Sequence, residues 1–308
     1  MAREGMNVFI ADAHCDSLYA LGVLGAHPEK LMVTAQRLEA GGVALQTYAL
    51  FSGGSSDSGT PWTRAQKMLD MIPWLGVPLL RGPLPDAPPE GPHGILSIEG
   101  GEVLEGSFAR LHHFHALGVK MIALTWNYEN EIGYPAVGGS GKGLKPFGRE
   151  LIAEMDALGM LCDVSHLNDA GIDEVLARAK LPVIASHSNA RWVTETPRNL
   201  ARAQVKEIAR RRGFIGLNFY PKFLASGRDA VVEDVLRHLD ALCEAGAEQC
   251  VGFGSDFDGI ERWPEGLGGP EGFPALLRMI EAQGYDEKTV AGIAGLNLWG
   301  VLKQAEAG

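Results

Sequence analysis

The 308-residue sequence lacks any uninterrupted apolar stretch of roughly 18 residues, the length that a helix needs to cross a bilayer. Residues 1–6 do not join a basic segment to an apolar core, as a secretion signal would. The 27 lysines and arginines form no cluster and the net charge is −11, which argues against nucleic-acid and membrane partners. The four cysteines include no Cys-x-x-Cys pair, so no disulfide framework is expected. We therefore expect a soluble, cytoplasmic protein.

Apolar, β-branched segments alternate with Ala- and Leu-rich amphipathic segments along most of the chain, the pattern of repeated β-then-α units. The predicted strands span residues 8–16, 43–51, 94–100, 121–127, 161–166, 182–188, 214–220 and 250–256. The predicted helices span residues 31–40, 63–75, 108–117, 148–158, 169–179, 203–211 and 230–245.

Eight such units predict an α/β fold, a (β/α)8 TIM barrel that forms one domain over residues 1–308, with an additional C-terminal helix near 287–303. The main alternative is an open, doubly wound sheet. That fold usually carries a Gly-rich phosphate loop after its first strand, and this sequence has none there. Gly- and Pro-rich stretches at 52–61 and 133–146 follow predicted strands, where a barrel forms its active site, so they are either lids or plain surface loops.

Five of the predicted strands end in a histidine or a carboxylate. These residues are His14 and Asp16, Glu99, His166, His187 and Asp256. A single His-x-Asp pair is more often two satisfied polar residues than a metal site, but a barrel gathers the carboxyl ends of all its strands on one face. Three imidazoles and three carboxylates exceed the needs of one tetrahedral zinc. They suit two divalent ions about 3.5–4 Å apart that share a carboxylate bridge.

Side-chain alternation along the first strand gives each of its residues an expected direction. His14 and Asp16 should point to one side, and Ala13 and Cys15 to the other. Cys15 should therefore pack against the surrounding helices and take no part in the metal site.

Six short motifs together resemble the membrane (renal) dipeptidase family, peptidase family M19, of the amidohydrolase-like superfamily. They are His14-x-Asp16, Glu99-Gly100-Gly101, Asp163-x-Ser165-His166, Ser186-His187-Ser188, Arg198-Asn199 and Gly254-x-Asp256-Phe257-Asp258-Gly259. The resemblance implies a metal-dependent barrel enzyme with two zinc ions that cleaves dipeptides, and it extends over nearly the whole chain.

The resemblance also implies roles for individual residues. His14 and Asp16 would bind the first zinc, His166 and His187 the second, and Glu99 together with a water or hydroxide would bridge them. Arg198 matches the arginine that binds the carboxylate of the substrate, and Asp256 matches the acid that handles the proton.

The chemistry then follows from the metals. Two zinc ions lower the pKa of a shared water towards about 7, and the resulting hydroxide attacks a polarised carbonyl. Asp256 would pass the proton to the leaving amine. A free carboxylate on Arg198 favours a dipeptide, and the family resemblance extends the expectation to a D-residue at its C-terminal position.

The chain departs from animal members of the family close to the expected substrate pocket. Trp126 stands where those members have a histidine after a Leu-Thr pair, and Glu102 replaces a second histidine. Trp126, Asn130 and Tyr220 are predicted to contact the substrate, although Tyr220 could equally be a core aromatic.

Two other functions stay open at this point. Another amidohydrolase-type enzyme could act on N-acyl amino acids or cyclic amides, because the metal ligands alone do not select the amide. A catalytically silent barrel could bind peptides or metals, although a complete ligand set with Asp256 argues against it. A homodimer is compatible with the sequence.

Overall fold

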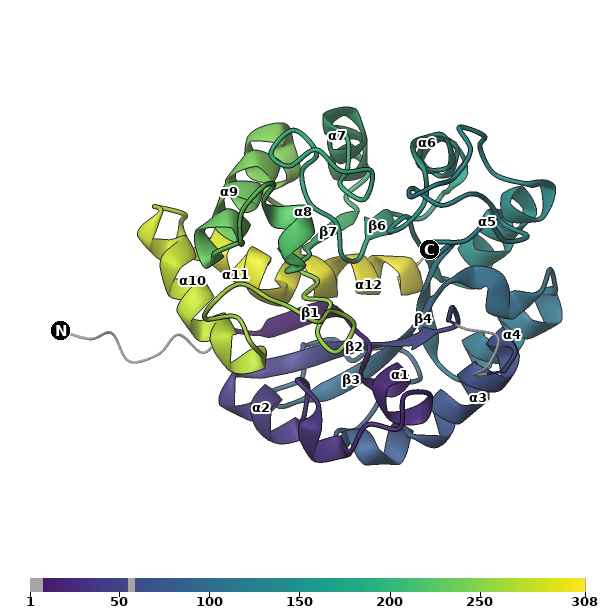
Figure 1. The fold of residues 1–308 in the computed structure, drawn as a ribbon, viewed down its shortest axis with the longest axis horizontal. Coiled ribbons are helices and arrows are strands. Elements are labelled where there is room, and N and C mark those ends of the chain that lie inside the picture. The colour runs from purple at the N-terminus through teal and green to yellow at the C-terminus, as the bar shows by residue number, and fades with distance from the viewer. Residues whose placement is uncertain (1–7, 55–58, 308) are drawn as a thin grey trace.

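Eight parallel strands form a closed barrel in the computed structural model, pairing in chain order from β1 to β8 and back to β1 (Figure 1). The structure describes residues 8–54 and 59–307. The strands are β1 (Ile10–Cys15), β2 (Val43–Phe51), β3 (His93–Glu99), β4 (Val119–Ala123), β5 (Leu161–Asp163), β6 (Val183–Ala185), β7 (Phe214–Leu217) and β8 (Val251–Phe253). The predicted (β/α)8 barrel is confirmed.

Helices surround the barrel and fill the connections between its strands (Figure 1). They are α1 (Ser17–Gly22), α2 (Ala35–Ala40), α3 (Pro61–Asp70), α4 (Phe108–Ala116), α5 (Pro146–Ala157), α6 (Asp169–Arg178), α7 (Arg202–Arg210), α8 (Pro221–Leu224), α9 (Val232–Leu242), α10 (Phe273–Ala282), α11 (Glu287–Ala291) and α12 (Asn297–Ala307). Among the described residues no helix has both the length and the apolar content that a bilayer crossing requires. The helices α1, α8 and α10 were not predicted.

The C-terminal helix α12 closes one end of the barrel, crossing behind the strands in Figure 1. Its side chains Leu298 and Leu302 belong to an apolar cluster with residues from β1 to β7, among them Leu45, Met121 and Phe214. A second, larger apolar cluster lies between the strands and the surrounding helices. The barrel is therefore plugged at the α12 end, and its polar residues gather at the opposite end, where the strands finish.

A bulge in β1 changes the direction of its side chains. Asp12 pairs with Gln46 and Cys15 with Tyr48, so three steps along β1 match two along β2. Ala13 consequently lies in the inner cluster and Cys15 in the outer one. The prediction that both point away from His14 was right for Cys15 and wrong for Ala13, because a bulge shifts the alternation by one residue.

The later strands are shorter than predicted. The sequence predicted that β5, β6, β7 and β8 end at residues 166, 188, 220 and 256. In the structure each of these strands ends three residues earlier, at Asp163, Ala185, Leu217 and Phe253. His166 and Asp256 have φ of 70° and 66°, which no strand residue adopts. The functional side chains of these units thus come from the turns after the strands.

The Gly-rich stretch at 133–146 packs against one of these turns. The backbone N–H of Ala136 donates to the carbonyl oxygen of His166 at 2.7 Å, and that of Asn168 donates to Tyr134. This stretch therefore lies at the end of the barrel where the predicted metal ligands gather. Of the other stretch, 52–61, residues 55–58 fall outside the described part of the chain.

Candidate metal centre

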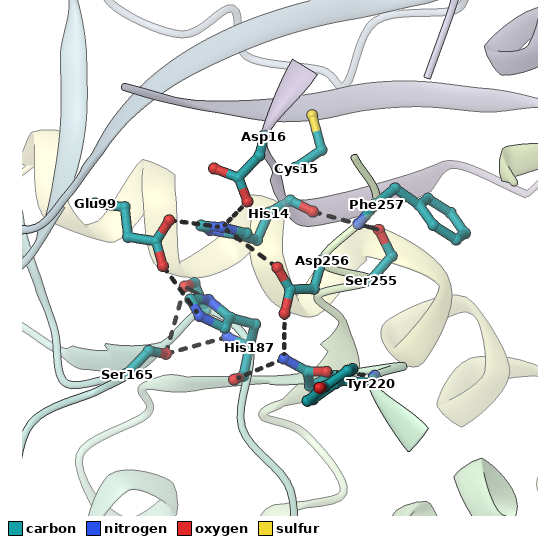
Figure 2. Close-up of polar contacts among 12 residues, drawn as sticks. His14, Cys15, Asp16, Glu99, Ser165, His187, Tyr220, Ser255, Asp256 and Phe257 are labelled. Carbon is teal, nitrogen blue, oxygen red and sulfur yellow. Dashed lines mark hydrogen bonds and ion pairs between the residues drawn. The ribbon is translucent and has the colours of Figure 1, made fainter. Parts of the chain in front are cut away.

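Donor atoms from the ends of five strands, or from the turns after them, converge at the open end of the barrel (Figure 2). The Nε2 atom of His14 lies 3.4 Å from Asp16 Oδ2, 3.5 Å from Glu99 Oε2 and 3.9 Å from Asp256 Oδ1. His166 Nε2 and His187 Nε2 are 2.9 Å apart. We call these six residues the donor cluster, and all but Asp256 are buried.

Glu99 links the two halves of the donor cluster. Its Oε2 atom faces His14, while its Oε1 atom lies 2.9 Å from His166 Nε2 and 3.7 Å from His187 Nε2. Each carboxylate oxygen therefore has its own set of nitrogen neighbours. This is the arrangement of a carboxylate that bridges two cations.

The hydrogen-bond partners of His187 show which of its nitrogens is free. The Ser186 hydroxyl donates to the Asp163 carboxylate, so it can only accept from His187 Nδ1, which lies 2.8 Å away. His166 Nδ1 lies 3.0 Å from the Asn127 side-chain oxygen, which accepts its proton. Both Nε2 atoms are thus left with bare lone pairs.

Three observations show that the donor cluster fits metal ions. Two bare imidazole nitrogens 2.9 Å apart repel each other unless a cation lies between them. His14 Nε2 and Asp16 Oδ1 are buried and have no hydrogen-bond partner among the described residues. Ligands about 2.1 Å from one ion at tetrahedral angles lie about 3.4 Å apart, close to the separations of His14 from Asp16 and Glu99.

Gly259 keeps space open beside the carboxylates. A Cβ atom at this position would lie 2.1 Å from Asp16 Oδ2 and 2.8 Å from Asp256 Oδ1. Any larger residue would therefore intrude on a predicted metal ligand, Asp16, and on the predicted proton carrier, Asp256.

Burial dominates the electrostatics of the donor cluster, and repulsion between neighbouring carboxylates adds to it. Burial, with help from the Asp16 carboxylate, raises the pKa of Glu99 to about 8, and burial raises the pKa of Asp256 to about 6. Burial lowers the pKa of His187 well below its usual range, which keeps this imidazole neutral. For His14, burial opposes protonation, but Glu99 and Asp16 together outweigh it and raise the pKa. Acids that suppress one another's ionisation in this way would be stabilised by cations.

Backbone strain coincides with two of the donor residues. His166 and Asp256 are among the five non-glycine residues with positive φ in the described part of the chain. The left-handed region costs a residue other than glycine about 1–2 kcal/mol. Such strain often marks a functional residue, and here it accompanies two side chains that point into the donor cluster.

Asp256 is held in place by a neighbouring turn. The Asn218 amide donates to Asp256 Oδ2 at 2.9 Å, which leaves Oδ1 directed at His14 (Figure 2). The Asp256 N–H donates to the His14 carbonyl at 3.3 Å. Sequence reasoning had not singled out Asn218, although its place at the end of the seventh predicted strand matches that of the predicted donors.

Arg198 places a buried positive charge beside the donor cluster. Its side chain donates to the carbonyl oxygen of His187 at 3.4 Å and lies over the Phe223 ring at 5.3 Å. Its Nε has no hydrogen-bond partner and the guanidinium makes no salt bridge within the described residues. Burial lowers the pKa of Arg198 to about 10, so the group stays charged at neutral pH.

The three predicted substrate contacts differ in what they offer. Trp126 is half-buried, with its ring 6.1 Å from that of His166. Tyr220 lines an open cleft of about 800 Å³ and donates to Glu261 at 3.3 Å. Asn130 is 7% exposed. Its amide nitrogen donates hydrogen bonds to Glu102 and Leu124, and its amide oxygen accepts hydrogen bonds from the N–H groups of Ile132 and Gly133. These four bonds leave Asn130 no free group for a substrate.

A closed parallel barrel with buried histidines and carboxylates at the carboxyl ends of its strands is typical of one class of proteins, the metal-dependent hydrolases. Comparison with known proteins then gives the family. The family model for membrane dipeptidase, peptidase family M19, matches residues 91–308. The chain therefore belongs to that family, which confirms the prediction from its motifs and the predicted enzyme class, a metallo-dipeptidase.

Individual relatives agree with this family. An uncharacterised Klebsiella pneumoniae protein from the pqqA 5′ region is 36% identical over 219 residues, 68% of this chain and 80% of that protein. An uncharacterised dipeptidase of Schizosaccharomyces pombe is 34% identical over 68% of this chain, but the match spans only 52% of its length.

Two solved structures cover almost the whole chain. The crystal structure of a dipeptidase of family M19 has a TM-score of 0.87 at 30% identity, covering 97% of this chain and 99% of that one. A metallopeptidase from Rhodobacter sphaeroides, liganded with a phosphinate mimic of the dipeptide L-Ala-D-Ala, has a TM-score of 0.84 at 28% identity with the same coverage.

Proposed function

We propose that this protein is a zinc-dependent dipeptidase that hydrolyses the peptide bond of dipeptides with a free C-terminal carboxylate. The observation that carries the proposal is Arg198, a buried guanidinium next to the donor cluster with no salt bridge among the described residues. A buried charge without a partner is destabilising, and a carboxylate bound by two parallel hydrogen bonds would compensate it. A substrate that ends one residue after the scissile bond meets this requirement.

The donor cluster would hold two zinc ions. One would be bound by His14 and Asp16, the other by His166 and His187, with Glu99 between them. When bound, such a metal pair lowers the pKa of a water molecule and polarises a carbonyl oxygen. Metal dependence follows from the family, and the choice of zinc rests on the nitrogen and oxygen donors of this site.

Asp256 is the residue that would move the proton. Its Oδ1 atom faces the donor cluster while Asn218 fixes Oδ2, so the carboxylate is oriented before substrate arrives. It would take a proton from the attacking water and deliver it to the amine that leaves. Glu99 could not do this while both of its oxygens face histidines.

Acceptance of a D-residue at the C-terminal position forms part of the proposal. Its support is the Rhodobacter sphaeroides relative, whose ligand mimics L-Ala-D-Ala. Cys15, Cys162 and Cys250 are buried free thiols, which suits the proposed cytoplasmic location. A homodimer and the lack of nucleic-acid or membrane partners stay predictions.

The test is a substrate series on the purified protein with its metal content measured. L,L- and L,D-dipeptides are compared with the same dipeptides carrying a C-terminal amide, in wild type and in Arg198→Gln. We expect two zinc ions per chain and a preference for the free carboxylate of about 10–100-fold, lost in Arg198→Gln. Arg191→Gln is the matched control, because Arg191 already pairs with Asp169.

Three results would contradict the proposal. Hydrolysis of N-acyl amino acids or cyclic amides without dipeptides would indicate the other amidohydrolase-type activity. Metal binding without hydrolysis of any of these substrates would indicate a silent binding barrel. Equal rates of hydrolysis for free and amidated dipeptides would show that Arg198 does not bind the substrate carboxylate.

A further inference from the structure

A row of aromatic side chains lines one side of the donor cluster. The ring of Phe51 lies 4.7 Å from Tyr19 and 4.8 Å from Trp126, and Trp126 lies 5.2 Å from Tyr128. The three contacts are edge-to-face, the preferred geometry for aromatic pairs. Gly53 allows the chain to lie against the row, since a Cβ there would be 2.6 Å from the Phe51 ring. We call these four residues the aromatic row.

The aromatic row begins beside the proposed bridging carboxylate. Phe51 is paired in register with Glu99 between β2 and β3, and the Trp126 ring lies 6.1 Å from that of His166. Phe51 is 8% exposed, Trp126 is half-buried and Tyr128 is 57% exposed. From Phe51 through Trp126 to Tyr128, exposure thus increases away from the donor cluster, as a wall that borders an open pocket would show.

The positively charged side chain of Arg198 lies on the opposite side of the donor cluster. Arg198 contacts the backbone of His187 after β6, and Asn218 after β7 holds Asp256 after β8. The aromatic row comes instead from the ends of β2 and β4 and from α1. A dipeptide with its carboxylate on Arg198 and its scissile carbonyl at the donor cluster must therefore extend its N-terminal residue towards the aromatic row.

We propose that Trp126, with Phe51 behind it, binds the side chain of the N-terminal residue and makes the enzyme prefer dipeptides with a large apolar or aromatic residue there. This inference rests on the proposed dipeptidase function and adds its substrate class. Ring faces offer apolar contact to an apolar side chain, and they offer no hydrogen-bond donor to replace the hydration of a carboxylate. The expected order of kcat/KM is aromatic, then branched aliphatic, then glycine, then acidic.

A competing location is the cleft of about 800 Å³ between the loops after β7 and β8. It is lined by Tyr220, Trp263 and charged residues of both signs, among them Arg228 and Glu261. Trp263 belongs to this cleft and is 40% exposed. It can therefore serve as a tryptophan control for Trp126. If the cleft selects the N-terminal residue, substitution of Trp263 will change the selectivity and substitution of Trp126 will not.

The experiment compares kcat/KM for Phe-Ala, Leu-Ala, Gly-Ala and Asp-Ala in wild type, Trp126→Ala, Trp126→Phe and Trp263→Ala. We expect the Phe-Ala to Gly-Ala ratio to fall by about 10–200-fold in Trp126→Ala, the range for losing an apolar pocket contact. Trp126→Phe should restore most of the ratio, and Trp263→Ala should leave it within about twofold of wild type. Bound metal is measured in each variant, because Trp126 also contacts His166.

The outcomes separate this inference from the function on which it rests. Failure of the wild type to cleave any of the dipeptides overturns the proposed function. Cleavage with an unchanged ratio in Trp126→Ala, or a ratio changed only in Trp263→Ala, overturns the role of Trp126 and leaves the dipeptidase intact. An equal loss on all four substrates with reduced metal content also overturns it, because Trp126 would then support His166 and make no contact with the side chain.

Discussion

The two sides of the donor cluster differ in the forces that hold them. On the side of β2 and β4, the aromatic row consists of rings packed on rings, starting at Phe51 in the ladder beside Glu99. On the side of β6 to β8, Arg198, Asn218 and Asp256 are positioned by hydrogen bonds between turns. Packing suits an apolar, variable substrate group, whereas directed hydrogen bonds suit a charge and a proton that every substrate shares.

The largest effect should come from the hydrogen-bonded side. Asp256→Asn preserves the size of the side chain but cannot take a proton, so we expect kcat to fall by about 10²–10⁴-fold with metal content unchanged. The matched control is Glu261→Gln, which changes an exposed carboxylate that hydrogen-bonds Tyr220, and its kcat should stay within about threefold of wild type. Normal turnover in Asp256→Asn would assign the proton to another group.

The next prediction concerns pH and the support of Arg198. His238 in α9 accepts from the Ala190 N–H through Nδ1 and donates to the Leu224 carbonyl through Nε2, joining the Arg198 loop to α8. Burial lowers the pKa of His238 to about 4, while Leu224 opposes the shift. Since the unfolded chain takes up a proton near pH 6.5 and the folded protein only near 4, stability is full above 6.5 and decreases as the pH falls towards 4.

Over that interval the loss attributable to His238 should be about 3 kcal/mol, at about 1.4 kcal/mol per pH unit. Urea unfolding of the zinc-loaded protein at several pH values measures it. His238→Gln should be less stable at pH 7 by about 1–3 kcal/mol, with a shallower fall in stability below pH 6.5. Parallel pH profiles for the two proteins would rule out His238 as the titrating group.

A substitution at Gly259 tests the part of the donor cluster that lies between its aromatic side and its hydrogen-bonded side. In Gly259→Ala the new methyl group would lie against Asp16 and Asp256, so we expect metal affinity to fall by about 10–100-fold. Gly300→Ala is the matched control, because a Cβ there meets no atom within 4 Å and the position lies in α12. That control should bind zinc normally and unfold at the same or a slightly higher temperature. Full zinc affinity in Gly259→Ala would mean that the ions lie elsewhere.

The barrel could be predicted from the sequence because apolar runs and helical periodicity recur eight times. The donor residues could be predicted because each follows such a run. The bulge in β1 could not, since an added residue in a ladder leaves no trace in the apolar pattern, and Ala13 was therefore assigned the wrong direction. The positive φ of His166 and Asp256 could not be predicted either, because the apolar run before each of them ends without a turn signal and the predicted strands continued too far.

Residues that position others were the hardest to predict. Asn218 acts by a hydrogen bond to Asp256 in a neighbouring loop, and Ser186 connects the adjacent His187 to Asp163 of the neighbouring strand. A serine or asparagine at a strand end has no special pattern in the sequence. Asn130 shows a related difficulty, because this polar residue near the pocket was predicted to contact substrate, while its hydrogen bonds hold its own loop together. Spacing identifies residue types at the site, but only contacts distinguish ligands from supports.

The smallest effect should come from Phe223, the one place where the hydrogen-bonded side also relies on a ring. Its ring lies 5.3 Å from the Arg198 guanidinium and 5.0 Å from Tyr220, and its carbonyl accepts from Asn199. Phe223→Leu keeps the apolar volume and removes the cation–π attraction, worth about 0.5–2 kcal/mol. We expect KM for dipeptides to rise about 2–30-fold with kcat nearly constant, and KM for amidated dipeptides to stay unchanged. Phe223→Tyr should restore the wild-type KM, whereas equal effects on both substrate types would show that Phe223 supports the fold and does not orient Arg198.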